Sequence, residues 1–474
     1  MKKWYAGIMF AIMLFVFFYY QQNGILQHDV VETAQYAEYV VTNEHDTLYE
    51  KYLVTKYPWR TGTLLLTAGM YYLMHFFSIS SECTAFFTQF LFGSLAVVFL
   101  YLFLREMYND TAAFFTALAF GLSAPLFNAV LSKDHGTEFF FACAAMYFLI
   151  YGLKNKNLLS LCISNIALGL TLWMREAMLL FPVIYYGFLV VYAYKNKIQE
   201  IYSAKNMFAL SIPYIFLTAG ALYVYVWMMI TNASQNLAVP LFTNTGKILQ
   251  SLWQWYPLLL LFAGIGIILA VKQKEYLVLF FTSIAVLFFI FFTKNATYDI
   301  RHLGMCVLFP LSVIECFVFS LLLEKYNDWK KYCIICIVVF VCIAGFIPGV
   351  SLFEQRKEHV YTKEFAQNIA TIVPENGIII IQKDFCLFFS YYAKRECIGL
   401  PDNFMATVDN YILSGKRVFV AYHAGFGFYD DETKNAIEQT YQLIPVYTGN
   451  FETFHHADLK PQVYEEYLIE VKSR

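Results

Sequence analysis

The chain has 474 residues, of which 59% are hydrophobic and 14% are charged. Soluble domains average about 25% charged residues, so this composition excludes an ordinary soluble protein and predicts a polytopic membrane protein. The formal net charge of −2 gives no indication of nucleic-acid binding, and we expect no nucleic-acid partner. Cys333 and Cys336 lie inside an apolar run, which favours packed or lipid-facing thiols over metal or redox chemistry.

A membrane-spanning helix needs about 20 predominantly apolar residues. Runs of this kind predict about eleven spans, over residues 4–20, 84–103, 112–131, 138–153, 158–174, 177–194, 208–230, 252–271, 276–293, 303–323 and 332–350. The first run resembles a signal peptide, but no small-residue cleavage site follows it, so we expect an uncleaved span. A further run, 61–78, is less apolar because it contains glycines, threonines and His75.

Loop charge indicates whether residues 61–78 cross the membrane. If they do not, the cytoplasmic segments hold Lys2, Lys3, Arg105, Lys154, Lys156, Lys195, Lys197, Lys205, Lys272, Lys274, Lys325, Lys330 and Lys331. The short outer loops after residue 79 then hold only Lys133, Arg175, Lys247, Lys294 and Arg301. The positive-inside rule favours this topology. Residues 61–78 are therefore predicted to be a re-entrant or interfacial helix pair in a first outer loop, 21–83, that folds back over a cavity.

The composition changes near residue 355, where charged residues, prolines and short alternating segments begin. We predict a transmembrane domain over 1–354 and a small extracytoplasmic α/β domain over 355–474. Its expected strands are 377–382, 385–392, 417–422, 441–447 and 465–471, and its expected helices are 362–373, 402–413 and 431–440. Cys386 and Cys397 either pair as a disulfide there or remain two buried thiols on adjacent strands.

Carboxylates occur beside the predicted outer ends of the spans. Asp29 precedes an amphipathic helix over 30–41, where it either caps that helix or places a carboxylate just outside the membrane. A second group, Asp134, His135 and Glu138, begins the span at 138, and Asp134 can also serve as a cap. Ionisable groups at such depth are commonly functional.

These side chains also include types that bind divalent cations. Carboxylate oxygens and imidazole nitrogens are common ligands of such ions. A metal site is therefore an alternative role for a set of outer side chains: Asp29, Glu32, Asp134, His135 and Glu138.

Cations lie in two further outer turns. Arg175 stands beside Glu176, and Arg301 follows Tyr298 and Asp299. Each arginine either forms a local salt bridge or holds a phosphate, because guanidinium donors match phosphate oxygens. We select Arg175, Arg301, Lys133 and Tyr298 as candidate phosphate-binding residues.

These positions resemble the membrane glycosyltransferases of the GT-C superfamily, in particular the branch of protein O-mannosyltransferases and lipid A aminoarabinose transferases. In that branch an acid in the first outer loop precedes a Tyr-Ala helix, as Asp29 precedes Tyr36-Ala37 here. The adjacent family acid is replaced by Val30. A second acid before a Phe-rich span is similar to Asp134.

Further parts of the chain are similar to the same branch. The segment Pro58-Trp59-Arg60 precedes the run 61–78 as a Pro-containing stretch precedes a non-spanning helix in the family, although the usual double proline is missing. Arg175 matches an arginine of a later outer turn. A Tyr/Arg loop before a Pro-bearing span is similar to Tyr298, Arg301 and Pro310. The resemblance covers the whole chain in layout.

The resemblance implies a multi-pass plasma-membrane enzyme whose active site and C-terminal domain are extracytoplasmic. Its donor would be a polyprenyl-phosphate-linked sugar, and its acceptor a hydroxyl or phosphate of a glycan, lipid or protein. Asp29 and Asp134 are then the candidate catalytic acids, and a divalent metal ion is a possible cofactor. Two alternatives remain open: a transporter or flippase of a lipid-linked sugar, and a membrane assembly protein without chemistry.

Overall fold

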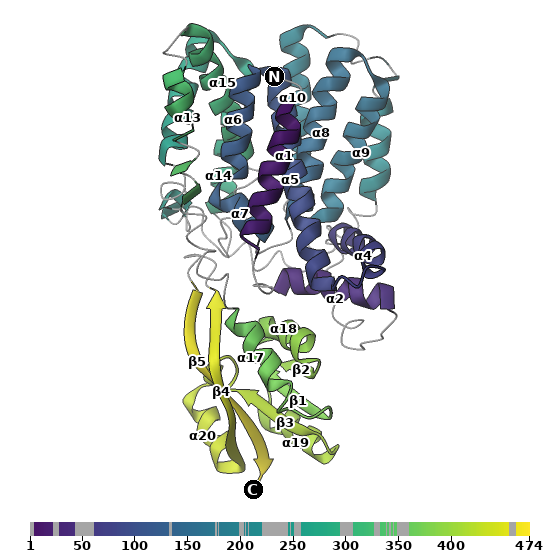
Figure 1. Ribbon diagram of the computed structural model, residues 1–474, viewed down its shortest axis with the longest axis vertical. Helices are drawn as coiled ribbons and strands as arrows, with labels where there is room; N and C mark the ends of the chain where they lie inside the picture. Colours follow the sequence, from purple (N-terminus) through teal and green to yellow (C-terminus); the bar gives the residue numbers. More distant parts are fainter. Residues whose placement is uncertain are drawn as a thin grey trace. The chain divides into compact units, whose positions relative to one another are not determined.

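The protein is described here from a computed structural model (Figure 1). The structure describes residues 4–21, 28–42, 61–131, 135–175, 178, 180–198, 203, 205–206, 208–219, 245–246, 248–250, 257–293, 307–326, 332–337, 339–340, 343–344, 346–347, 360–454 and 461–474. The chain divides into two compact units. The first comprises Met1–Gln21, Val54–Met70 and Phe86–Glu354, and the second comprises Gln22–Leu53, Tyr71–Ala85 and Gln355–Arg474.

The first unit is helical. Its main helices are α1 (Tyr5–Tyr19), most of α5 (Ser81–Met107), α6 (Asp110–Gly121), α7 (Ala124–Leu131), α8 (Gly136–Asn155), α9 (Leu158–Met174), α10 (Phe181–Asn196), α13 (Pro257–Gln273), α14 (Tyr276–Thr293) and α15 (Phe309–Lys325). Helical residues also occur over Phe208–Ala219 and in short pieces between 332 and 347. Every range predicted as a span therefore contains helix in the part of the chain that the structure describes.

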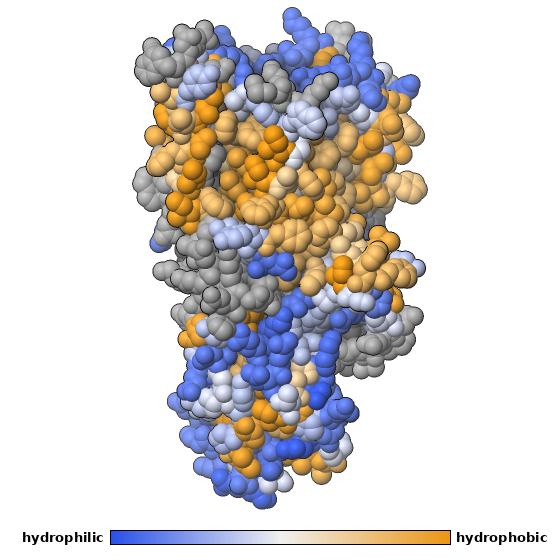
Figure 2. All heavy atoms as spheres, in the orientation of Figure 1, coloured by the Kyte–Doolittle hydropathy of each residue, from blue (hydrophilic) through white to orange (hydrophobic). Residues whose placement is uncertain are grey.

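Two of the helices described, Ser81–Met107 and Gly136–Asn155, are long and apolar enough to cross a membrane. Shorter apolar helices accompany them, among them Tyr5–Tyr19 and Leu158–Met174. Hydrophobic side chains cover much of the visible side of the helical unit (Figure 2). This surface fits a lipid environment, in which helices satisfy their own backbone hydrogen bonds. The number of spans stays a prediction.

Helices α1 and α5 run antiparallel. The rings of Tyr5 and Tyr101 lie 6.5 Å apart at one end of the pair, and those of Phe17 and Phe90 lie 6.0 Å apart towards the other end. The end of α1 therefore lies beside the early part of α5. The chain leaves α1 and enters α5 at the same end of the helical unit.

Polar contacts connect the loops at the opposite end of this unit, called here the lysine-rich end. Lys154 in the last turn of α8 pairs with Glu106 in α5 at 3.2 Å, and Lys195 in α10 pairs with Glu275 before α14. The backbone N–H of Asn109 donates to Ser320 Oγ in α15 at 2.9 Å. The loops predicted to be cytoplasmic thus meet at one end.

The second unit contains a five-stranded mixed sheet with the order β2-β1-β3-β5-β4. Its strands are β1 (Gly377–Ile381), β2 (Glu396–Gly399), β3 (Arg417–Ala421), β4 (Tyr441–Phe454) and β5 (Pro461–Ser473). Strand β1 is parallel to β2 and β3, with Ile379 opposite both Cys397 and Phe419. Strand β5 is antiparallel to β3 and β4. The unit also holds α2 (His28–Thr42), α17 (Tyr361–Ile369), α18 (Lys383–Ala393), α19 (Phe404–Leu413) and α20 (Asp431–Thr440).

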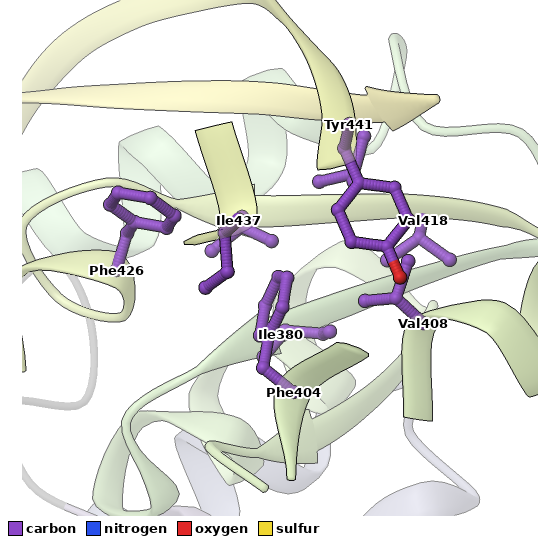
Figure 3. Close-up of a cluster of buried hydrophobic side chains, with 9 residues drawn as sticks. Ile380, Phe404, Val408, Val418, Phe426, Ile437 and Tyr441 are labelled. Carbon is purple, nitrogen blue, oxygen red and sulfur yellow. The ribbon is translucent and has the colours of Figure 1, made fainter. Parts of the chain in front are cut away.

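Helices cover both faces of this sheet. On one face α19 and α20 bury Val408 and Ile437 in a cluster with Ile380, Val418 and Tyr441 (Figure 3). On the other face the rings of Phe365 in α17, Phe389 in α18 and Phe451 in β4 contact one another, with centroids 5.7–6.1 Å apart. Burial on both faces explains why β1 reads Gly-Ile-Ile-Ile-Ile without alternation.

The strand predicted over 385–392 is wrong, because these residues lie in α18. Aromatic residues favour strands, but β1 and β2 are parallel, and parallel neighbours need a crossover connection. Only residues 382–395 are available for it, so they form the helix. Cys386 therefore lies on a helix rather than a strand. It and Cys397 are buried free thiols, with their sulfur atoms 3.1 Å apart.

The chain itself fills the usual ligand-binding position of this sheet. In open α/β sheets ligands bind beyond the carboxyl ends of strands whose connections reverse direction, here β1 and β3. The N–H of Gln382 donates to Ala424 O at 2.7 Å across this point. A Cβ on Gly425 would lie 2.6 Å from Ala421 O. Buried Glu466 fixes the same loop by accepting from the N–H groups of His423 and Ala424.

The first prediction concerns orientation. With the exposed native cysteines replaced, Lys156→Cys at the lysine-rich end should react with an impermeant maleimide only after permeabilisation. Asp431→Cys, at a side chain 98% exposed in the C-terminal segment, should react in intact cells. The reason is that cytoplasmic loops retain an excess of lysine and arginine. Labelling of Lys156→Cys in intact cells would contradict the predicted topology.

Candidate active site

The candidate site lies in the helical unit at the end where α8 begins and α9 finishes, called here the Arg175 end. His135 stands at the N-cap position of α8, and Glu138 lies in its first turn. His135 Nδ1 and Glu138 Oε1 are 2.6 Å apart, and both side chains are buried. Residues three apart on a helix are neighbours, and a carboxylate is favoured near a helix N-terminus by the peptide dipoles.

The start of α8 packs closely on α5. The N–H of Gly136 donates to Gln89 Oε1 at 2.8 Å. A Cβ on Gly136 would lie 2.5 Å from the backbone oxygen of Gln89, so any larger residue would force the two helices apart. The close approach fixes the first turn of α8, and with it His135 and Glu138.

Thr63 connects α8 with the end of α9. It lies in the first turn of α4 (Thr61–His75). Its Oγ1 is 3.0 Å from Thr137 Oγ1 in α8 and 3.4 Å from the carbonyl oxygen of Met174 in α9. Gly62 beside it has no room for a side chain, because a Cβ there would lie 2.6 Å from Met174 Cε. Three segments distant in sequence thus meet at Thr63.

Arg175 directly follows Met174. It leaves α9 in an extended conformation, and its N–H donates to Thr171 O at 3.3 Å. Its side chain is only 4% exposed. Removing a guanidinium from water is costly unless charged or polar partners compensate. The Arg175 end therefore holds a desolvated cation in the same cluster of helix ends as the His135–Glu138 pair.

The predicted site residues fall into three groups. His135, Glu138 and Arg175 are brought to one end of the helical unit. Glu32 is buried in α2 of the second unit, and α2 begins at His28, so Asp29 lies in its first turn and not at the cap. Outside the described residues lie the Asp29 side chain and all of Lys133, Asp134, Tyr298 and Arg301.

The predicted metal ligands do not assemble in the part of the chain that the structure describes. There, no three His, Cys, Asp or Glu residues are grouped so that they could hold a metal ion. His135 and Glu138 contact each other. A site built from Asp29 or Asp134 depends on side chains outside the described residues.

Sequence reasoning missed Thr63, Thr137 and Gln89. Each is an uncharged polar residue in an apolar segment, and such residues give little signal singly. The available signal was the pairing of small residues with threonine, in Thr61-Gly62-Thr63 and Gly136-Thr137. In membrane helices small residues allow close backbone approach, and threonines form hydrogen bonds between helices.

Residues 65–228 match the family described as dolichyl-phosphate-mannose-protein mannosyltransferase. No curated protein matches the sequence. Together with the solved structures described next, the family match confirms the resemblance to the GT-C glycosyltransferases.

Three solved proteins share the fold. The chain is similar to ArnT from Cupriavidus metallidurans in the apo state, at 13% identity over 98% of this chain and 97% of that one, with a TM-score of 0.59. ArnT bound to undecaprenyl phosphate gives a TM-score of 0.58, at the same identity and coverage. The oligosaccharyltransferase of Archaeoglobus fulgidus, in complex with Zn and sulfate, gives 0.58 at 12% identity, covering 94% and 72%. The arabinofuranosyltransferase AftD from Mycobacteria gives 0.55 at 12% identity, covering 100% of this chain and 42% of AftD. At these identities the likeness shows the fold.

The second prediction tests the Thr63 contact by a double-mutant cycle. Thr63→Val should lower the free energy of unfolding by about 1 kcal/mol, because it removes a buried hydrogen bond of the Thr137 hydroxyl. Replacing both threonines with valine should cost less than the sum of the two single replacements. The measurement is thermal or denaturant unfolding of purified protein. Strict additivity would show that the two hydroxyls do not interact.

Proposed function

We propose that the chain is an integral membrane glycosyltransferase that moves a sugar from a polyprenyl-phosphate-linked donor to an acceptor hydroxyl or phosphate on the extracytoplasmic face. The family match and the shared GT-C fold support glycosyl transfer. The ArnT structure with undecaprenyl phosphate supports a polyprenyl-linked donor. The observation that carries the proposal is the Thr63 connection, which joins the start of α8 to the segment that bears Arg175.

The orientation of the helices supports an extracytoplasmic site. The lysine-rich end corresponds to the cytoplasmic side by the positive-inside rule. Because α1 ends and α5 begins at the opposite end, α2 and α4 belong to a first outer loop. The Arg175 end then faces outward in the plasma membrane. No pool of nucleotide sugars is expected there, so a donor must arrive attached to a lipid.

Helix α4 fits a position at the membrane interface. One of its faces is buried through Leu64, Ala68 and Tyr71. The other exposes apolar side chains at Tyr72 and Leu73, and the following Phe77 is 79% exposed. A helix that is buried on one side and apolar without charge on the other is suited to contact lipid. A lipid-linked donor could approach the site beside this helix.

The reaction is a displacement at the anomeric carbon of the donor sugar. The acceptor oxygen forms a bond to that carbon while the bond to the phosphate oxygen breaks, and polyprenyl phosphate leaves. A carboxylate takes the proton of an acceptor hydroxyl. We assign this role to Asp29, in the first turn of α2, with Asp134 as the second acid.

The leaving phosphate requires positive charge close by. Arg175 supplies a desolvated guanidinium, which can donate two parallel hydrogen bonds to phosphate oxygens in a bidentate geometry. Its interaction with a phosphate is stronger in a buried setting than in water, because the local dielectric constant is lower. Arg301, Lys133 and Tyr298 are proposed to extend this phosphate site.

A divalent metal ion remains an alternative source of positive charge. The Archaeoglobus fulgidus oligosaccharyltransferase was solved with Zn. In the present chain the side chains proposed to hold such an ion are Asp29, Glu32, Asp134, His135 and Glu138. When bound, it would neutralise charge on the leaving phosphate.

The third prediction concerns the base. Asp29→Asn should reduce sugar transfer at least about 100-fold, because a positioned base contributes about 100- to 10,000-fold. Expression and thermal stability should stay near wild type. Transfer is measured with purified protein, a polyprenyl-phosphate sugar and an acceptor. Asp431→Asn is the matched control at an exposed carboxylate. Near-normal transfer by Asp29→Asn would remove Asp29 from the mechanism.

The fourth prediction separates phosphate binding from structure at Arg175. Arg175→Lys keeps the charge but loses the two-pronged geometry, so it should weaken donor use about 10-fold or more with little change in melting temperature. Arg395→Lys is the structural control, because that guanidinium donates to the carbonyl oxygens of Val373 and Ala370. If Arg175→Lys lowers the melting temperature and leaves donor affinity intact, Arg175 is structural.

A further inference from the structure

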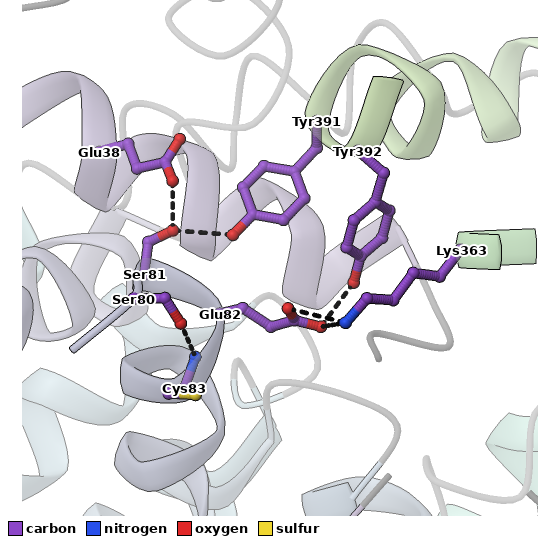
Figure 4. Close-up of polar contacts among 8 residues, drawn as sticks. All are labelled: Glu38, Ser80, Ser81, Glu82, Cys83, Lys363, Tyr391 and Tyr392. Atoms are coloured by element: carbon purple, nitrogen blue, oxygen red, sulfur yellow. Dashed lines mark hydrogen bonds and ion pairs between the residues drawn. The ribbon is translucent and has the colours of Figure 1, made fainter. Parts of the chain in front are cut away.

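The C-terminal segment makes two tyrosine contacts that lead to carboxylates within the second unit, one through Ser81 and one directly (Figure 4). Helix α18 carries both tyrosines, Tyr391 and Tyr392, at adjacent positions. The contact of Tyr391 leads through Ser81, the first residue of α5, to α2, and that of Tyr392 leads to Glu82 in α5. The two neighbouring tyrosines thus contact adjacent residues at the start of α5, and only the Tyr391 contact continues to α2.

The first contact is a chain of hydrogen bonds that ends on α2. Ser81 Oγ donates to Glu38 Oε1 at 2.7 Å and lies 2.8 Å from the Tyr391 hydroxyl. An ionised carboxylate only accepts, so the single Ser81 proton points to Glu38 and the Tyr391 hydroxyl donates to Ser81. Burial raises the pKa of Tyr391, which keeps its hydroxyl protonated. Lys394 pairs with the other oxygen, Glu38 Oε2, at 3.2 Å.

The second contact does not involve α2. The Tyr392 hydroxyl donates to Glu82 Oε1 at 2.7 Å, and Lys363 Nζ lies 3.1 Å from Glu82 Oε2. Glu82 lies in the first turn of α5. Both contacts therefore reach the first turn of α5 from adjacent tyrosines over similar hydrogen-bond lengths, but only the first continues through Ser81 to α2.

The position of Glu38 on α2 gives the first contact its significance. Glu38 follows Asp29 by nine residues, which corresponds to about 13.5 Å along a helix. Helix α2 also packs against α18, where the side chain of Gln35 reaches Leu387 O at 3.5 Å. Over such a length a tilt of about 4° moves the first turn by about 1 Å. A misplacement of about 1 Å can reduce catalysis about 100-fold.

We infer that Ser81 and Tyr391 are positioning residues, which hold α2 through Glu38 and thereby place the Asp29 carboxylate for transfer. The inference rests on the proposed function for the role of Asp29. It gives the C-terminal segment a part in the reaction without contact to donor or acceptor. The contact of Tyr392 with Glu82 provides the built-in comparison, because its loss leaves the whole chain from Tyr391 through Ser81 to Glu38 in place.

The experiment compares Tyr391→Phe and Ser81→Ala with Tyr392→Phe in the full-length protein. Each replacement removes one hydroxyl. Tyr391→Phe and Ser81→Ala should lower kcat about 10-fold or more while the KM for the polyprenyl-phosphate sugar stays within about twofold. Ser81→Thr, which retains a hydroxyl, should restore kcat. Tyr392→Phe should leave kcat near wild type.

Hydrogen exchange of the α2 amides tests the same inference without any activity. Exchange over residues 30–42 should accelerate in Tyr391→Phe and Ser81→Ala and stay unchanged in Tyr392→Phe. Unchanged exchange in all three variants would overturn the inference, as would accelerated exchange with normal kcat. Equal kcat losses in Tyr391→Phe and Tyr392→Phe would show a general structural effect and would also overturn it. A wild-type protein that transfers no sugar would contradict the proposed function, while the exchange result would still decide whether Tyr391 holds α2.

Discussion

A single hydroxyl group, that of Thr63, lies where three distant parts of the helical unit meet. It contacts Thr137 at the start of α8 and the carbonyl of Met174 at the end of α9. Gly62 and Gly136 allow the backbones to come this close, because a side chain at either position would collide with its neighbours. The buried cation Arg175 and the His135–Glu138 pair take their positions from these helix ends. The phosphate site proposed for the protein therefore depends on Gly62 and Gly136, which have no functional group of their own.

Burial away from water is the reason why the charge of Arg175 indicates a binding site for an anion. Charged side chains are costly away from water, and at the lysine-rich end of the described helical unit Lys154 and Lys195 meet glutamates near the surface. Arg175 departs from that pattern because it is almost fully buried. A buried guanidinium interacts strongly with an anion that enters its surroundings. We propose that a lipid phosphate is this anion.

The sequence predicted the features that follow from composition and from the pattern of apolar residues, and it missed those that depend on tertiary contacts. Apolar runs located the helices, since each predicted span contains helix where the structure describes it. The strands at 377 and 417 were predicted because their apolar residues are continuous or nearly so. Residues 385–392 were misassigned because strand propensity is local, whereas the need for a crossover between parallel strands is a property of the whole sheet.

Arg175, His135 and Glu138 were predicted from their charge at helix ends. Thr63 was missed because its only signal in the sequence is the Thr61-Gly62-Thr63 pattern, and its role appears only when α4, α8 and α9 are brought together.

We propose that the Arg175 end of the helical unit binds the phosphate of a polyprenyl lipid. The most direct measurement is a cryo-electron microscopy map of the full-length protein in lipid nanodiscs with added undecaprenyl phosphate. We expect density for the phosphate within hydrogen-bond distance of the Arg175 guanidinium, and its loss in a map of the Arg175→Ala variant. A phosphate bound at the lysine-rich end instead, or a saturated complex whose lipid phosphate makes no contact with Arg175, would contradict the claim.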